Sequence, residues 1–165
     1  MKLTKGDIKM KMNKAYAGVG ARHAPPEVLK ELNHLAKYYA NEGYTLRSGS
    51  ADGCDSAFER GCSFVGGKME IFLPWRGFNG NLSPLFTPPP LAYRIAEKYH
   101  PAWNNLSPAV KKLMARNSQQ ILGKDCNQPC EFVLCYTKGG KLVGGTSQAL
   151  RIAIDLNIPV INLGE

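Results

Sequence analysis

The sequence predicts an α/β fold of Rossmann type: a doubly wound, mainly parallel sheet of about five or more strands with helices on both faces. Short apolar runs alternate along the chain with segments whose apolar residues recur at three- and four-residue spacing. This is the pattern of strands alternating with helices. Because crossover helices connect parallel strands, the alternation implies a sheet covered on both faces.

The first two units of the pattern are each a strand, a glycine-bearing turn and a helix. The first strand is the apolar run at 15–19. Pro25 and Pro26 open the following helix, because proline is tolerated in the first helical turn. Gly43 ends that helix, since glycine readily adopts the left-handed cap conformation. The second unit places its strand, turn and helix at 44–47, 48–53 and 54–62.

The rest of the chain continues the alternation after an irregular segment. A third strand is expected at 68–73, and the proline-rich segment 74–90 is expected to be a functional or mobile loop. The remaining elements are a helix at 91–99, a helix from Ser107 to about Gln119, a strand at 131–137, a helix through Ala149, Ile152, Ala153 and Leu156, and a strand at 159–163. We expect residues 15–165 to form one domain.

Composition narrows the class of protein. A chain of 165 residues with 44% hydrophobic and 21% charged residues is globular in composition. It has no apolar run of the ~20 residues that cross a bilayer and no signal-peptide block at its start, so we expect a cytoplasmic protein without a membrane partner. Five cysteines without a repeating pattern argue against a disulfide framework, and we expect neither a metal site nor a cofactor.

The formal net charge of +8 favours anionic ligands. Five lysines fall in the first fourteen residues: Lys2, Lys5, Lys9, Lys11 and Lys14. We expect residues 1–14 to form a basic, flexible arm, which is either a solvated tail or a contact for a nucleic-acid backbone.

Three glycine-bearing turns predict where a ligand binds. Open parallel sheets bind ligands outside the carboxyl ends of their strands. The turns Gly18–Gly20, Ser48–Gly53 and Gly144–Thr146 are expected at this edge, each leading toward a helix N-terminus whose free N–H groups favour an anion. One such turn alone is equally explained as an ordinary tight turn, and Thr146 alone as an ordinary N-cap. Together they predict a shared phosphate pocket.

Further side chains are candidates for the same pocket. Arg116, followed by Asn117, offers a planar donor pair suited to phosphate or carboxylate. Asp52 or Asp55 either binds a ribose or complements a helix dipole. Trp75 either stacks on a base or packs its loop onto the domain. Asp52, Asp55 and Arg116 are also the candidates for catalytic residues, without a reaction assigned.

Four segments together resemble the SMF/DprA and Lonely Guy (LOG) superfamily: Gly18–Arg22, Ser48–Asp55, Met114–Asn117 and Gly144–Ala149. The resemblance spans about residues 15–163. It implies a Rossmann-like fold that binds nucleotides or nucleotide-derived ligands, and it resembles small, single-domain members encoded by phages. With Trp75 added, the expected ligand-binding residues are Gly18, Gly20, Arg22, Ser48, Gly49, Asp52, Asp55, Trp75, Arg116, Asn117, Gly144, Gly145, Thr146 and Gln148.

The two branches of the superfamily imply different activities. LOG enzymes hydrolyse the N-glycosidic bond of nucleoside 5′-monophosphates with a glycine-threonine motif, an upstream arginine and a glutamate. Arg116 and Thr146 match the arginine and the threonine, but the glutamate position is Ala149, beside Gln148, and neither is a carboxylate. A hydrolase would therefore use Asp52 or Asp55 instead.

DprA proteins bind single-stranded DNA, usually with extra flanking domains. We therefore expect a module that binds a nucleoside phosphate or an ADP-ribose-like molecule. The alternatives are LOG-type hydrolysis and single-stranded DNA binding, and a homodimer is a further alternative because family members often form dimers.

Overall fold

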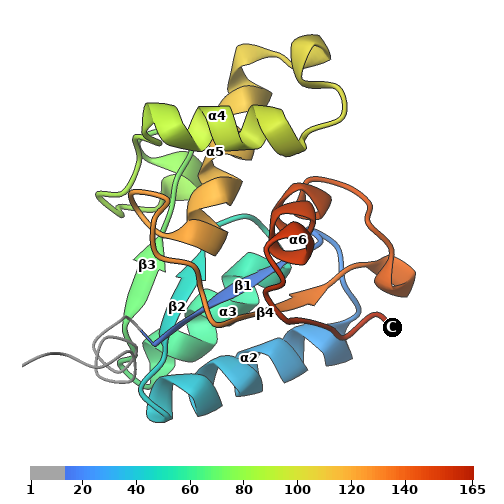
Figure 1. Ribbon diagram of the computed structural model, residues 1–165. Helices are drawn as coiled ribbons and strands as arrows, with labels where there is room; N and C mark the ends of the chain where they lie inside the picture. Colours follow the sequence, from blue (N-terminus) through green and yellow to red (C-terminus); the bar gives the residue numbers. More distant parts are fainter. Residues whose placement is uncertain (1–13) are drawn as a thin grey trace, which may run out of the picture.

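The computed structural model describes residues 14–165 (Figure 1). Five strands form one parallel sheet in the order β3-β2-β1-β4-β5. The strands are β1 (Ala15–Gly20), β2 (Thr45–Ser48), β3 (Met69–Ile71), β4 (Phe132–Tyr136) and β5 (Val160–Asn162). The α-helices are α2 (Pro26–Asn41), α3 (Cys54–Phe64), α4 (Pro90–Tyr99), α5 (Pro108–Leu122) and α6 (Thr146–Asp155). The Rossmann-like α/β fold is confirmed.

Successive side chains of a strand point to opposite faces of the sheet. In β1 the side chains on both faces are buried, and helices cover each face. Tyr16 of β1 packs with residues of α2 and α3, including the fully buried Phe58. Ala17 and Val19, on the other side of the same strand, pack with residues of α4, α5 and α6. The sheet is therefore doubly wound, as the sequence predicts.

The strand order places a topological switch point beside β1. The chain builds β1, β2 and β3 outward on one side and then returns to add β4 and β5 on the other. β1 pairs with β4 along its whole length, from Tyr16 opposite Phe132 to Gly20 opposite Tyr136. The crevice at the carboxyl ends of β1 and β4 is where such folds bind ligands.

The prediction that Gly18–Gly20 form a turn is wrong, because these residues are the end of strand β1. A Cβ on Gly18 would lie 2.7 Å from Leu46 Cδ1 and from Phe58 Cγ. A Cβ on Gly20 would lie 2.7 Å from the Cβ of Cys54. These glycines are required for close packing of α3 on the sheet, and neither has a positive φ.

Other boundaries shift by a few residues. β3 covers only Met69–Ile71 of the expected 68–73, because Leu73 N donates to the carbonyl of Leu85 in the following loop. α5 continues past Gln119 to Leu122, where Gly123 takes a φ of +85° and ends it. The expected irregular segment 74–90 is irregular through Pro89 apart from the 3₁₀ turn η1 (Phe78–Gly80), and its last residue, Pro90, already begins α4. Two further 3₁₀ turns are η2 (Trp103–Asn105) and η3 (Lys138–Gly140).

The predictions from composition concern the cysteines, a membrane span and the basic N-terminal arm. All five cysteines are buried and unpaired, so they pack as small apolar side chains. No helix within residues 14–165 has the length and apolar character needed to cross a bilayer. The predicted basic arm lies outside the described residues except for Lys14, which is exposed and donates from Nζ to the carbonyl of Glu42 at 3.0 Å.

Replacing Gly18 by alanine should destabilise the fold. The new Cβ collides with the Phe58 ring, and overpacking of this kind costs about 1–3 kcal/mol in the free energy of unfolding. Urea denaturation measures the change. Gly145→Ala is the matched control, because Gly145 has a φ of −65° and the nearest atom to its new Cβ is Met114 Cε at 3.9 Å. A Gly18→Ala protein as stable as the wild type would contradict the packing argument.

Candidate functional site

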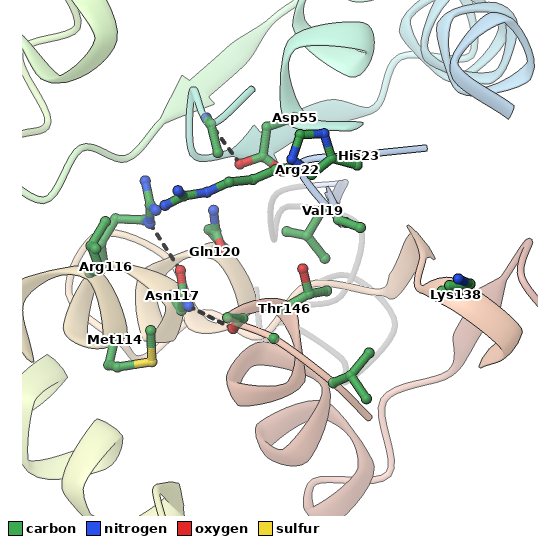
Figure 2. Close-up of a pocket in the computed structure, with 17 residues that line it drawn as sticks. Val19, Arg22, His23, Asp55, Met114, Arg116, Asn117, Gln120, Lys138 and Thr146 are labelled. Carbon is green, nitrogen blue, oxygen red and sulfur yellow. Dashed lines mark hydrogen bonds between the residues drawn. The ribbon is translucent and has the colours of Figure 1, made fainter. Parts of the chain in front are cut away.

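A pocket of about 370 Å³ opens at the carboxyl end of β1 (Figure 2). Its walls are the end of β1 with the loop to α2, the N-terminal turn of α3, one face of α5 and the loop that enters α6. Eight of the expected ligand-binding residues line it: Gly20, Arg22, Asp55, Arg116, Asn117, Gly144, Gly145 and Thr146. The structure thus brings residues from four separate segments to one edge of the sheet.

The N-terminus of α6 offers free backbone donors to this pocket. Gly144 has a φ of +69°, which glycine adopts without strain and which turns the chain into the helix. Ser147 N and Gln148 N donate to the carbonyls of Gly144 and Gly145, each at 3.2 Å. The N–H groups of Gly145 and Thr146 donate no hydrogen bond within residues 14–165. They are the orphan donors of a helix start, aligned with its positive dipole end.

Arg116 is a buried, fixed cation on the neighbouring wall. It is only 5% exposed. Its Nη1 donates to the carbonyls of Gly49 and Phe72, the latter at 3.1 Å, and its Nε donates to Asn117 Oδ1 at 2.9 Å. The Phe78 ring lies 5.4 Å from the guanidinium carbon. Nη2 has no hydrogen-bond partner in the described part of the chain. The N–H groups of Nη2 are therefore free to donate to a ligand from a guanidinium whose position is fixed by its other bonds.

Asn117 joins the arginine to the helix start. Its Oδ1 accepts from Arg116, and its Nδ2 donates to the carbonyl of Gly145 at 3.2 Å. One carboxamide therefore connects α5 to the loop before α6 (Figure 2). Asn117 thus links the arginine wall of the pocket to the wall formed by the start of α6.

Arg22 adds a second positive charge from the loop after β1. It is exposed, and its side chain extends along the pocket toward Arg116 (Figure 2). Burial lowers the pKa of Arg116 to about 10; the charge of Asp55 opposes this shift and the charge of Arg22 adds to it, and Arg116 stays protonated at neutral pH. Neither arginine forms an ion pair within residues 14–165, where the one ion pair joins Arg47 and Glu70. Two converging cations outnumber the one carboxyl group, Asp55, among the described residues that line the pocket, and this balance favours an anionic ligand.

Asp55 is the carboxylate nearest to this cluster. It is 4% exposed in the first turn of α3, and its Oδ2 accepts from Ala51 N at 3.3 Å. Burial raises the pKa of Asp55 to about 6, although the positive charge of Arg116 and hydrogen bonds from the backbone oppose the shift. Asp55 can therefore donate or accept a proton near neutral pH.

Comparison with known proteins supports the fold. No protein-family model matches the chain, and no curated protein matches its sequence. Among solved structures, DNA processing protein A from Helicobacter pylori matches with a TM-score of 0.61 and 18% identity, covering 93% of this chain and 66% of that one. The molybdenum cofactor carrier protein from Chlamydomonas reinhardtii matches with a TM-score of 0.59 and 16% identity, covering 92% and 77%. The chain has the Rossmann-like α/β fold that these two proteins share.

The position that the sequence resemblance assigns to the LOG glutamate does not face the pocket. Ala149 is 1% exposed and packs in the core between the sheet and α4–α6. Gln148 is fully buried; it donates to the carbonyl of Ala96 at 2.9 Å and accepts from Arg151 at 2.6 Å. Ala149 therefore packs in the core and Gln148 is held by hydrogen bonds within the protein, so other residues must act on a ligand in the pocket.

The remaining expected residues also lie outside the pocket lining. Gly18 and Ser48 are buried in the sheet, where Ser48 Oγ donates to the carbonyl of Gly18 at 2.6 Å. Gly49 contributes indirectly, because its carbonyl holds Arg116. Asp52 is exposed to solvent. Trp75 is 38% exposed and packs edge-on against Phe78 at 5.3 Å.

Several lining residues were not expected from the sequence. They include His23, Lys138, Met114, Val143 and the buried Gln120. Gln120 follows Arg116 by four residues and Asn117 by three, so helical spacing places it on the same face of α5. This spacing is the signal in the sequence from which Gln120 could have been predicted. No group of histidine, cysteine, aspartate or glutamate side chains within residues 14–165 could hold a metal ion.

The raised pKa of Asp55 predicts a pH-dependent stability. The folded protein holds the Asp55 proton up to about pH 6, whereas the unfolded chain loses it near 3.8, so the free energy of unfolding falls between these values. Asp55→Asn removes this contribution. The variant should gain roughly 2–3 kcal/mol relative to wild type between about pH 4 and about pH 7. Urea denaturation at both pH values measures it, and a difference that is constant with pH would contradict the burial of an ionisable Asp55.

Proposed function

We propose that the protein binds the phosphate of a nucleotide or nucleotide-derived ligand in this pocket. The observation that carries the proposal is the convergence of unpaired donors: the N–H groups of Gly145 and Thr146 and the Nη2 of Arg116. The free N–H groups and the positive dipole end of a helix start favour an anion, and a phosphate there accepts from these donors together. The exposed Arg22 adds a second positive charge to the lining of the pocket.

The rest of the pocket fits a nucleoside. Its volume of about 370 Å³ lies in the range of small-ligand sites. Leu113, Met114 and Val143 form an apolar wall that can contact a base. Asp55 can accept hydrogen bonds from a sugar. The Helicobacter protein is described as binding single-stranded DNA and the Chlamydomonas protein as carrying the molybdenum cofactor, so proteins with this fold take different ligands.

Calorimetric titration with nucleoside mono- and diphosphates and ADP-ribose should reveal binding at micromolar affinity or tighter. Arg22→Ala should weaken it about tenfold, and Arg116→Ala more strongly, because a charge-assisted hydrogen bond contributes about 1.5–3 kcal/mol. Arg60→Ala is the matched control, since Arg60 is exposed and lies outside this pocket. A single-stranded oligodeoxynucleotide in the same series tests the DNA alternative. The proposal fails if no member of the nucleotide panel binds.

A second candidate function is N-glycoside hydrolysis, favoured by the Asp55 carboxyl in the pocket with its pKa of about 6. Asp55 would act in place of the glutamate that Ala149 replaces. Incubation with nucleoside 5′-monophosphates, followed by chromatography, should then release free base from the wild type and none from Asp55→Asn. If the wild type binds nucleotide and releases no base, the protein is a binding module.

A further inference from the structure

Gln120 is a buried polar side chain in the pocket without a partner. It is 3% exposed, it lines the pocket, and its carboxamide makes no hydrogen bond with any residue from 14 to 165. A Cβ on Gly49 would lie 2.2 Å from its Nε2 and 2.7 Å from Arg116 Nη1. The absence of a side chain at Gly49 therefore leaves room for the Gln120 amide beside the guanidinium. Figure 2 shows Gln120 and Arg116 on the same helix beside the pocket.

The other buried amides of this region have protein partners. Asn117 bonds to Arg116 and Gly145, Gln148 bonds to Ala96 and Arg151, and Gln119 donates to the carbonyl of Lys124 at 3.0 Å. The Oε1 of Gln119 is buried without a partner. Gln120 is the exception among these amides, because neither its Nε2 nor its Oε1 has a partner within residues 14–165. A buried amide without a partner is less favourable than a leucine of similar size. Because the exception lines the pocket, its partner is expected to be a group of the ligand.

The chemistry around Gln120 indicates what that group is. An amide offers one acceptor and two donors, whereas the phosphate donors of the pocket, Gly145, Thr146 and Arg116, offer N–H groups alone. Asp55 lines the same pocket from the first turn of α3, and its Oδ2 accepts from Ala51 N in the turn that also contains Gly49. A pair of neighbouring hydroxyls, each able to donate and accept, satisfies an amide and a carboxylate together.

We propose that Gln120 and Asp55 bind the vicinal 2′- and 3′-hydroxyls of a ribose, so that the pocket selects ribonucleotides over deoxyribonucleotides. This inference rests on the proposed function, which places the 5′-phosphate at the start of α6. It adds a specificity-determining residue, Gln120, whose amide lies beside the Arg116 guanidinium on the α5 wall of the pocket.

The test compares three ligands and three proteins by calorimetry. The ligands are the tightest-binding ribonucleoside 5′-monophosphate and its 2′-deoxy and 3′-deoxy forms. Wild type should bind the ribonucleotide about fivefold or more tightly than the deoxy forms, because each lost hydroxyl leaves a buried polar group unpaired. Gln120→Leu should lose the preference over one deoxy form. Gln119→Leu, which changes an equally buried glutamine outside the pocket, should keep both preferences.

The outcomes separate this inference from the proposed function. Equal binding of ribonucleotide and deoxyribonucleotides by wild type overturns the inference and leaves phosphate binding intact. Preferences that persist unchanged in Gln120→Leu also overturn the role of Gln120. Absence of any binding by wild type overturns both. Should Gln120→Leu fail to fold, as judged by near-ultraviolet circular dichroism, Gln120→Met takes its place in the same comparison.

Discussion

A buried guanidinium organises the functional edge of this sheet. Arg116 stays charged, and its burial is tolerable because carbonyls and a carboxamide take its donors. Two of these carbonyls, from Gly49 and Phe72, directly follow β2 and β3, so the same contacts that satisfy the charge tie α5 to the ends of two strands. Asn117 extends the connection to the start of α6. The hydrogen bonds that satisfy the Arg116 charge therefore also fix the walls of the pocket relative to one another.

The electrostatic character of the pocket follows from the same group. Two arginines and the N-terminal dipole of α6 meet there, and the one buried carboxylate, Asp55, is partly neutralised near neutral pH because burial raises its pKa. The pocket is therefore electropositive although it contains an acidic residue.

Local sequence signals predicted most of the fold. These signals are the spacing of apolar residues in strands and helices and the positions of proline and glycine, and each acts over a few residues. They could not distinguish a glycine needed for a turn from one needed for close packing, which is why Gly18 and Gly20 were misplaced. Asp52 and Asp55 are three residues apart, and only the orientation of α3 shows that Asp55 is the one in the pocket. Gln120 was missed for the same reason, since helical spacing defines a stripe on α5 without showing which stripe faces the sheet.

The central claim is that one anion contacts the start of α6 and Arg116 together. Nuclear magnetic resonance of the isotopically labelled protein, titrated with a nucleotide, tests it most directly. The account predicts that the amide resonances of Gly145 and Thr146 and the Nε resonance of Arg116 shift together along one saturable curve. Shifts confined to other residues, or shifts of the α6 amides that leave Arg116 unaffected, would contradict it.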